Sequence, residues 1–543
     1  MLRPGVAALV AALALLAPPV AGATRYAVGL KDGVDAEAVR LELERRTETP
    51  VESLAPVPAF VVDAPSAAAF ARIAGVRYVE RLRARRLAFT PTDPYVNRQW
   101  YLAQNRSYDA WLEPPPLAPV RVAVIDSGVD RDHPDLAPRI AAAQTFVDGA
   151  VDADVQGHGT FVAGIIGAQL NNQIGIAGLA PAVDLLIAKV VSPQRTIPVE
   201  AEAKAIRWAV QSRARVINMS LGGLRDPTDA SRDTFSRLEA DAIAYAVSKG
   251  VVVVAAVGNG DQAPAQPWPY ASYPAALPHV LGVSAVARDG SSPSFSNRDP
   301  IYNDIAAPGE DILSTFPRAL TAAHDTCPEQ GYSSCGPEEY RNAEGTSFAA
   351  PQVSAAAAAL LAVRPTLQPN QVISILERTA VDVSPANGCK VCPLGRDKYT
   401  GWGRLDVAAA LASLDGVLPA VDRFEPNDDA GTAAFTLWGA KLRVSATVDF
   451  WDDQNDVYRV FLRQGQRLYA SLSGPAAAAL VVWRPGTVAV DDLGRQDLRA
   501  TRSTRSGSTK FVSYRARERG WHFVQVKLGA PGSGAYRLRV EKR

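Results

Sequence analysis

Between residues 90 and 416, nearly continuous apolar runs alternate with segments of helical spacing. The apolar runs lie at 120–125, 185–191, 216–221 and 251–256, and helical patterns at 200–210 and 238–247 lie among them. Strands that are apolar along their whole length are typical of a parallel sheet buried on both faces. The pattern therefore predicts an α/β fold, a parallel sheet with helices on both faces.

The segments on either side have different patterns. Residues 24–83 predict strands at 25–30, 59–63 and 76–80 and helices at 35–46 and 66–74, which together make a small α+β unit. Beyond a composition break at 415–420 the helical pattern ends, and runs at 468–472, 522–528 and 536–540 alternate with period two. Such runs, separated by Gly and Pro, predict a β-sandwich of short strands.

The first residues follow the plan of a secretory signal. Arg3 precedes an apolar stretch at 6–17, Pro18 and Pro19 end it, and small residues at 21–23 offer a cleavage site. The alternative, a membrane anchor, needs about 20 apolar residues. We expect a signal peptide at 1–23 and a protein that is secreted, either extracellular or periplasmic in transit. The apolar run at 355–363 is too short to span a membrane and predicts a buried helix.

These patterns divide the chain into four segments. They are the signal peptide at 1–23, the small α+β unit at 24–89, the α/β domain at 90–416 and the β-sandwich at 417–543. The basic stretch at 81–86 and the Pro-containing residues after it predict an exposed, cleavable linker.

Composition limits the chemistry that this chain can use. The 543 residues are 47% hydrophobic and carry a net charge of +1, which excludes a globally basic nucleic-acid binder. The chain has only five His and four Cys. Four Cys allow three pairings. Local disulfides, Cys327 with Cys335 and Cys389 with Cys392, are favoured over a zinc site or a redox role for the second pair.

Three segments of the α/β domain carry the side chains of a nucleophilic hydrolase. Asp126 stands where an apolar strand meets a Gly-containing turn, and His158 lies between two glycines at the start of an apolar helix. Ser347 precedes an Ala-rich helix, near the positive end of its dipole. Taken singly, each has a structural alternative, such as a turn carboxylate or a helix cap. The α/β-hydrolase elbow loses support because residue 349 is Ala, where that motif needs Gly.

Taken together, these segments resemble the subtilisin family of serine peptidases. The family's three blocks occur in its order as IDSG at 125–128, GHGT at 157–160 and GTSFAAP at 345–351. Four further segments match, namely NMSLGG at 218–223, VAAVGN at 254–259, YPA at 273–275 and IAAPG at 305–309. The resemblance covers about residues 90–410 and implies a serine endopeptidase with Ser347 as nucleophile, His158 as base and Asp126 as its orienting carboxylate.

The resemblance also implies how a substrate lies in the site. Asn259 supplies a side-chain donor to the oxyanion, beside the backbone N–H of Ser347. Protein or peptide substrates pair with an edge strand, and small uncharged residues line a roomy, mostly apolar S1 pocket of broad preference. The substrate-binding residues are Ser220, Leu221, Gly222, Ala255, Ala256 and Val257.

A structural calcium ion is implied in the same way. The segment QLNNQIGI at 169–176 resembles the family's calcium loop, and a hard cation requires several oxygen ligands. The implied ligands are Asp93, Asp135, Leu170, Asn172, Ile174 and Ile176, the Leu and Ile residues acting through backbone carbonyls. The alternative is an Asn-rich surface turn.

The resemblance also implies functions for the segments on either side of the α/β domain. Residues 24–89 resemble the inhibitory propeptide of the family, a partner that assists folding and is then removed; a retained binding module is the alternative. Residues 417–543 resemble the pre-peptidase C-terminal domain of secreted bacterial peptidases, through DRFEPNDD at 422–429, NDVY at 455–458 and GAYRLRV at 534–540. We expect a monomer without nucleic-acid partners or a membrane anchor. The competing function is a catalytically silent scaffold whose β-sandwich binds a ligand.

Overall fold

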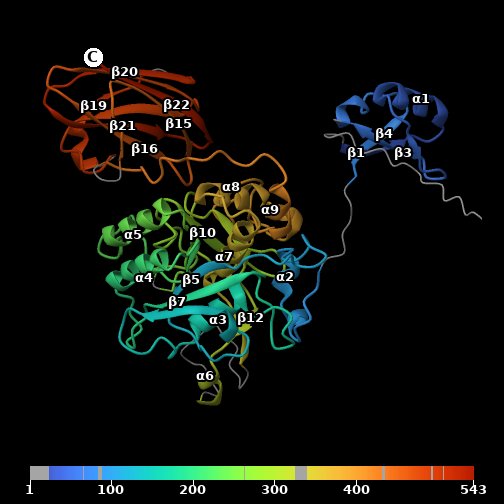
Figure 1. The fold of residues 1–543 in the computed structure, drawn as a ribbon, viewed down its shortest axis with the longest axis horizontal. Coiled ribbons are helices and arrows are strands. Elements are labelled where there is room, and N and C mark those ends of the chain that lie inside the picture. The colour runs from blue at the N-terminus through green and yellow to red at the C-terminus, as the bar shows by residue number, and fades with distance from the viewer. Residues whose placement is uncertain are drawn as a thin grey trace, which may run out of the picture. The chain divides into compact units, whose positions relative to one another are not determined.

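The computed structural model describes residues 24–64, 66–82, 89–261, 263–323, 339–430, 434–490, 493–504 and 507–543. The chain forms two compact units, Met1–Arg86 and Leu87–Arg543 (Figure 1). The signal peptide predicted at 1–23 lies outside the described residues.

The first unit is a small α+β fold. Its elements are β1 (Thr24–Leu30), α1 (Ala36–Thr47), β2 (Glu52–Ser53), β3 (Ala59–Ala64) and β4 (Val76–Arg81). The strands form an antiparallel sheet in the order β2-β3-β1-β4, and α1 contributes Val39 and Leu43 to its core. Asp35 caps α1 by accepting backbone N–H groups of the first turn. The helix predicted at 66–74 is only a 3₁₀ turn at Ala67–Ala69.

The α/β domain is built on a seven-stranded parallel sheet of order β11-β10-β9-β8-β5-β7-β6. The strands are β5 (Val120–Asp126), β6 (Ile140–Thr145), β7 (Val183–Lys189), β8 (Val216–Met219), β9 (Val252–Ala256), β10 (Val280–Val286) and β11 (Ile305–Pro308). This confirms the predicted fold class.

Helices cover both faces of this sheet (Figure 1). Successive residues of a strand point to opposite faces, and β5 shows both environments. Val122 and Val124 join the core beneath α3 (His158–Gly167) and α7 (Thr346–Val363). Ala123 and Ile125 join a second core beneath α4 (Val199–Gln211) and α5 (Arg237–Ser248). The uninterrupted apolar runs of the sequence reflect these two layers.

The helix α7 passes through the middle of the domain. By length and composition it is apolar enough to cross a membrane, but 89% of it is buried inside the molecule. It is therefore a core helix, as the sequence pattern predicted. The remaining elements of the domain are α2 (Trp100–Gln104), β12 (Ile312–Thr315), α6 (Arg318–Ala323), β13 (Tyr340–Ala343), α8 (Pro369–Thr379) and α9 (Val407–Ser413).

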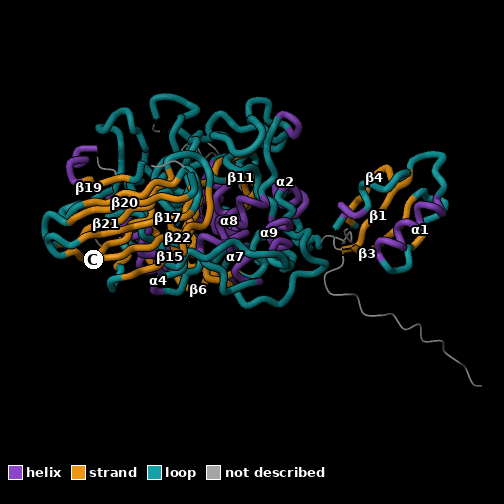
Figure 2. The backbone as a smooth tube through the Cα atoms, turned by 90° about the horizontal axis from the view of Figure 1, so that it is seen from above, coloured by secondary structure: helices purple, strands orange, loops and turns teal. Residues whose placement is uncertain are grey.

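The C-terminal domain, residues 417–543, is the expected β-sandwich and consists mainly of strands and loops (Figure 2). One sheet has the order β14-β16-β21-β18-β19 and the other β15-β22-β17-β20. The strands are β14 (Phe435–Thr436), β15 (Lys441–Asp449), β16 (Asn455–Leu462), β17 (Arg467–Ser473), β18 (Ala478–Trp483), β19 (Arg499–Arg502), β20 (Thr509–Arg515), β21 (Gly520–Leu528) and β22 (Ser533–Lys542). Alternate residues of both sheets make a common core, including Tyr458 and Tyr536.

The structure contains the disulfide between Cys389 and Cys392 that the sequence favoured. Cys327 and Cys335 lie outside the described residues.

Two buried glutamates face each other between α4 and α5. Glu202 is 6% exposed and Glu239 is 5% exposed. Burial raises the pKa of Glu202, and the neighbouring Glu239 raises it further, while burial also raises the pKa of Glu239. A pair of carboxyl groups in this setting favours a shared proton, since two buried like charges repel.

The pair predicts a loss of stability at alkaline pH. A carboxyl group whose pKa is raised on folding stabilises the fold fully below its unfolded pKa, and that stabilisation is lost as the pH rises through the raised value. The Glu202→Gln substitution removes one of the two ionisable groups. Between about pH 6 and about pH 9, the melting temperature of this variant should therefore fall less than that of wild type. We expect the two falls in melting temperature to differ by about 2–4 °C, which is the shift that a change of about 1 kcal/mol in the free energy of unfolding produces in a larger domain.

The matched control is Glu200→Gln on the exposed side of the same helix. Thermal unfolding followed by circular dichroism measures both variants. An equal pH dependence in wild type and Glu202→Gln would show that folding does not raise the pKa of Glu202 into this range.

Candidate active site

The aspartate and histidine of the predicted triad meet at the carboxyl edge of the parallel sheet. Asp126 is the last residue of β5, and His158 is the first residue of α3. The imidazole Nδ1 lies 2.8 Å from Asp126 Oδ1, which also accepts the backbone N–H of Ser127 at 2.7 Å. The side chain of Asp126 is 2% exposed and that of His158 is 14% exposed. The carboxylate is thus placed to orient the ring.

The electrostatics of this pair favour a charged imidazole. Burial lowers the pKa of His158, but the charge of Asp126 and the hydrogen bond to it outweigh burial, and a smaller contribution comes from Asp154. The net effect raises the pKa above its ordinary value of 6.5. The imidazolium is therefore stabilised, which is what a general base needs once it has taken a proton.

Two glycines allow α3 to begin so close to the strand. Gly157 has φ +79°, and a Cβ there would lie 2.4 Å from the Phe316 ring. A Cβ on Gly159 would lie 2.1 Å from the Gly128 carbonyl oxygen. Neither position accepts a side chain without displacing its neighbour, which explains the Gly-His-Gly pattern physically.

Sequence reasoning missed a buried carboxylate that joins these loops. Asp154, 4% exposed, accepts the Ser127 hydroxyl at 2.8 Å and the backbone N–H groups of Gly157 and Thr160 at 2.9 Å each. It also accepts the Thr160 hydroxyl at 2.6 Å. Asp154 is a positioning residue for both the Asp126 turn and the start of α3. The signal for it was a carboxylate three residues before the Gly157 helix start.

Ser347 is the second residue of α7, which starts beside α3. The Phe348 ring centroid lies 5.4 Å from that of the His158 imidazole. The Ser347 hydroxyl donates to the Ser220 carbonyl at 3.2 Å, and the Ser220 hydroxyl donates to the Ser347 carbonyl at 2.7 Å. This reciprocal pair ties the nucleophile's helix to the segment that follows β8.

Asn259 contacts the same helix start. Its Oδ1 accepts the Thr346 backbone N–H at 2.9 Å and the Thr346 hydroxyl at 2.8 Å. Because these bonds engage the oxygen, the amide is held in one orientation with Nδ2 as the donor that remains. A Cβ on Gly345 would lie 3.2 Å from that Nδ2, and Gly345 has φ +145°. The structure thus brings Asn259 to the start of the helix that carries Ser347.

A cavity of about 190 Å³ adjoins Ser347 and contains most of the predicted substrate-binding residues. Ser220, Leu221, Gly222 and Ala256 line it together with Asn259. Ala255 and Val257 do not; they are fully buried in the core beneath α5, because alternate residues of a strand point to opposite faces. The lining is more polar than the sequence led us to expect, with Ser272, Asn297 and the carboxylate of Asp261.

The predicted calcium ligands also come together. Asp93 accepts the backbone N–H groups of Asn171 and Asn172 at 2.9 and 3.0 Å. Asp135 accepts the Asn172 side-chain amide at 2.7 Å and the backbone N–H of Ile176 at 2.9 Å. The loop at 169–176 therefore closes over two buried carboxylates. Leu170 and Ile174 lie in the same loop, and Ile174 donates its N–H to Asn172 Oδ1 at 2.8 Å.

The electrostatics of this loop fit a hard cation. Burial raises the pKa of Asp135 to about 6, and the nearby charge of Asp93 contributes in the same direction. A cation between the two carboxylates would relieve both burial and repulsion. The two carboxylates and the loop carbonyls are oxygen donors of the kind that Ca²⁺ prefers, whereas the Asn172 amide presents its nitrogen to Asp135 and its oxygen to the Ile174 N–H.

The comparison with known proteins agrees with this geometry. A family model described as the subtilase family matches residues 118–403, which is more than half of the chain. The protein belongs to the subtilase family. Thermitase of Thermoactinomyces vulgaris is 33% identical over 326 residues, which cover 60% of this chain and 99% of thermitase. Subtilisin DY of Bacillus licheniformis is 34% identical over 294 residues, 54% of this chain and 91% of that protein.

Among solved structures, a protease of Pseudoalteromonas arctica matches with a TM-score of 0.47 and 27% identity, over 60% of this chain and 99% of that one. Membership of the subtilase family supports serine peptidase activity for the α/β domain.

Proposed function

We propose that this subtilase is a secreted serine endopeptidase that hydrolyses peptide bonds through Ser347, His158 and Asp126 and matures by processing itself. The observation that carries the proposal is the 2.8 Å hydrogen bond between His158 and buried Asp126, beside the start of α7, where the Phe348 ring lies 5.4 Å from the His158 ring. Family membership and this geometry support the same chemistry.

The proposed mechanism is that of subtilisin, with these residues in the corresponding roles. A neutral hydroxyl is a weak nucleophile, so His158 accepts the Ser347 proton as the oxygen attacks the scissile carbonyl. Asp126 holds Nδ1 protonated and stabilises the imidazolium, which then protonates the leaving amine. Water repeats the sequence on the acyl-enzyme and releases the acid product.

The developing oxyanion needs donors that are already in place. Asn259 Nδ2 and the backbone N–H of Ser347 fill this role in the proposal, since Thr346 holds the Asn259 amide by its oxygen. The Ser347 N–H belongs to the first turn of α7, where backbone N–H groups have no partner within the helix.

The substrate is proposed to be an extended protein or peptide chain that lies along Ser220, Leu221 and Gly222. Most residues that line the adjoining cavity have small side chains, so we propose broad substrate specificity. A Cβ on Gly222 would lie 2.2 Å from the Tyr273 carbonyl oxygen, so this segment must approach its neighbour closely. Asp261 adds a carboxylate among the described lining residues, which favours polar or basic side chains beside apolar ones.

The proposal includes a structural calcium ion and a maturation step. Calcium bound by Asp93, Asp135 and the 169–176 loop would fasten the chain near residue 93 to the α/β domain. Residues 24–89 are proposed as the inhibitory propeptide, removed by cleavage near the basic stretch at 81–86, and residues 1–23 as the secretion signal.

The direct test of the enzyme is Ser347→Ala. We expect casein hydrolysis to fall by about 10⁶-fold, the loss known for the catalytic serine of subtilisin, and self-processing to stop. A fluorophosphonate probe should label wild type and fail to label the variant. Ser248→Ala, on the exposed end of α5, is the matched control and should behave as wild type. Mature wild type that binds no probe and cleaves no casein would instead favour the silent scaffold.

The raised pKa of His158 predicts the position of the acid limb. Only neutral imidazole accepts the serine proton, so kcat/KM should fall as the pH drops through the His158 pKa. Because Asp126 raises that pKa, the midpoint should lie above the ordinary histidine value of 6.5. A pH profile with a short chromogenic peptide measures it. A midpoint below the ordinary value would contradict the assigned electrostatics.

Calcium removal tests the loop. EDTA should lower the melting temperature of the mature protein, since a ligand at 100 times its Kd contributes about 2.7 kcal/mol. Asp135→Asn should remove most of this EDTA-dependent shift, whereas Asp132→Asn, an exposed neighbour, should leave it unchanged. If both variants keep the full shift, the ion is bound elsewhere and the loop assignment fails.

A further inference from the structure

The C-terminal domain presents one face of a four-stranded sheet to solvent. The strands β15, β22, β17 and β20 lie side by side (Figure 2), and their inward residues, such as Val444, Ala470 and Leu538, belong to the core of the sandwich. Successive residues of a strand point to opposite sides of a sheet, so the alternate positions face outward. These outward positions are exposed or partly exposed along all four strands. A ligand can therefore reach this face from solvent.

Arginines occupy the centre of this outer face. Arg537 and Arg539 point outward from β22, and Arg443 of β15 lies directly opposite Arg539. In the part of the chain that the structure describes, none of these three arginines forms an ion pair or a side-chain hydrogen bond. Like charges directly opposite each other in a sheet are destabilising. The folded domain thus holds together positive charges that an external anion would balance.

Further cations surround these arginines. Arg467 of β17 and Arg515 of β20 form a second like-charged pair across two neighbouring strands. Glu541 lies on the same face, but its carboxylate already pairs with the Nε atom of Arg543 at 3.0 Å and the Nζ atom of Lys441 at 3.8 Å. The face therefore keeps an excess of positive charge beyond its internal ion pairs, and such an excess attracts anions.

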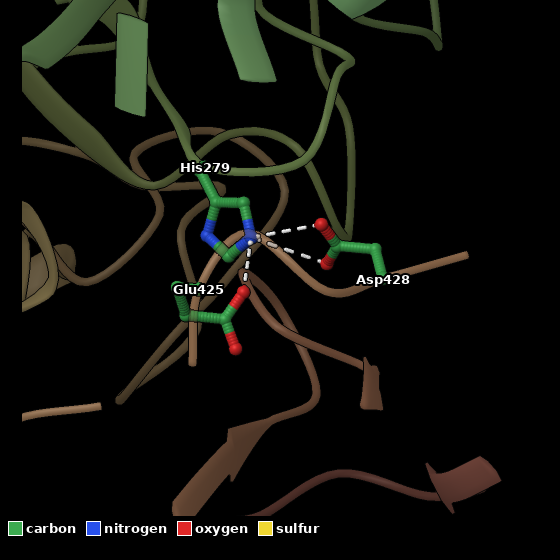
Figure 3. Close-up of side chains that lie close together, drawn as sticks. All are labelled: His279, Glu425 and Asp428. Atoms are coloured by element: carbon green, nitrogen blue, oxygen red, sulfur yellow. Dashed lines mark hydrogen bonds and ion pairs between the residues drawn. The ribbon is translucent and has the colours of Figure 1, made fainter. Parts of the chain in front are cut away.

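The acidic side chains of the domain gather in a different place. Glu425 and Asp428 lie against His279 of the α/β domain (Figure 3), whose Nε2 atom is 3.0 Å from an oxygen of each carboxylate. Asp452 lies 4.0 Å from the Nδ1 atom of the same ring. This acidic pocket around Glu425 is at the contact between the two domains. The net charge of +1 for the whole chain therefore conceals a domain with separate acidic and basic regions.

Two hollows follow β22 across the basic face. The first, of about 630 Å³, is lined by Arg443 and Arg539, and the second, of about 620 Å³, is lined by Arg537. They are neighbours because 537 and 539 are successive outward positions of one strand. From Arg537 to Arg543 the chain advances about 20 Å, at about 3.4 Å per residue. An extended polymer fits such a site better than a small ligand does.

Hydroxyl groups stand beside the arginines. Ser445 and Ser473 lie opposite Arg537 on the two neighbouring strands, and Ser471 lies opposite Arg539. A guanidinium group binds a carboxylate through two parallel hydrogen bonds, because its planar fork matches the two oxygens. A serine hydroxyl can both donate to and accept from a sugar hydroxyl. Guanidinium and hydroxyl groups in alternation therefore match a chain of sugars that carries carboxylates.

The aromatic side chains of the face favour a sugar chain over a nucleic acid or a membrane. Single-stranded nucleic acids stack successive bases on several aromatic rings. Phe511 is 49% exposed, whereas Tyr469 is only partly exposed and has the Arg543 guanidinium 5.0 Å from its ring centroid. One open ring suits a contact with the apolar face of a sugar, and it offers little apolar surface for insertion into lipid.

We propose that the outer face of β15, β22, β17 and β20 binds an acidic polysaccharide, whose carboxylates pair with Arg443, Arg537 and Arg539. The inference does not depend on the proposed peptidase activity. Binding of this kind attaches the C-terminal domain, and with it the α/β domain, to a carboxylated matrix. Because the arginines are exposed, the attraction weakens as the salt concentration rises.

The test measures binding of a fluorescein-labelled oligogalacturonate by fluorescence anisotropy. The parent protein is the full chain carrying Ser347→Ala, which prevents self-cleavage. We expect saturable binding that is weaker at about 200 mM than at about 50 mM NaCl. The triple variant Arg443→Gln, Arg537→Gln, Arg539→Gln should bind about 10-fold more weakly than the parent, since an exposed ion pair contributes up to about five-fold.

A matched control removes the same charge from the other sheet of the sandwich. Arg499 and Arg502 are exposed on β19, and Arg519 is exposed just before β21. Changing these three residues to Gln should leave the affinity close to that of the parent. Without ligand, the triple variant of the basic face should melt at no lower temperature than the parent, because it removes the like-charged pair of Arg443 and Arg539. Its weaker binding then does not result from unfolding.

A second triple variant separates carboxylate recognition from general attraction. Replacing the same three arginines with Lys keeps the charge but loses the planar fork that holds a carboxylate through two hydrogen bonds. The affinity of this variant should lie between those of the parent and the Gln variant. Equal affinity of the Lys variant and the parent would overturn the proposed carboxylate contacts.

Competition experiments identify the class of partner. Unlabelled oligogalacturonate should displace the probe, whereas neutral dextran should not. Oligodeoxythymidine, and vesicles of phosphatidylcholine with phosphatidylserine, should displace it only at higher concentrations of negative charge. Displacement by either at lower concentrations than oligogalacturonate would overturn the proposal in favour of a nucleic acid or a membrane. Undiminished binding in the Gln variant would overturn it as well.

Discussion

The position of α7 is the constraint on which the rest of this structure depends. It packs against β5, β8, β9, β10 and β11, so almost all of its circumference must be apolar and its side chains small. Its first turn then reaches the carboxyl edge of the sheet, where Ser347 contacts the segment after β8 and Thr346 contacts the segment after β9. Ser347, the proposed nucleophile, is placed by the packing of a core helix of which 89% is buried.

Buried charge is the second organising feature, and the chain resolves it in different ways. Asp126 is balanced by an imidazole that gains a proton during the proposed reaction. Glu202 and Glu239 lower their charge by holding protons. The pocket around Glu425 receives a histidine from another domain. In each case the low dielectric of the interior strengthens the interactions that decide which protonation state is favoured.

Much of the fold and of the site was predictable from local patterns. The apolar strands and the helices at 200–210 and 238–247 were confirmed, the helices to within one residue at each end, because two buried layers require uninterrupted apolar runs. The triad blocks are short because each places its glycines beside the end of a strand or the start of a helix that carries the predicted residue. Prediction failed where orientation matters: Ala255 and Val257 belong to the right segment, but their side chains point into the core. Likewise, the polar lining of the cavity includes Asn297, which lies far along the chain from the predicted substrate-binding segments at 220–222 and 255–257.

The sequence by itself determined the class of fold and the subtilase membership, and it predicted the roles of Asp126, His158, Ser347 and Asn259, since these depend on periodicity and on compact motifs. Only the tertiary structure decided which side chains share a buried environment. His279 looked like an ordinary residue after a proline, 146 residues before Glu425 in the chain. Its contacts with the C-terminal domain join residues that are far apart in the sequence. Electrostatic coupling depends on distance in space and on burial, and a local sequence pattern records neither.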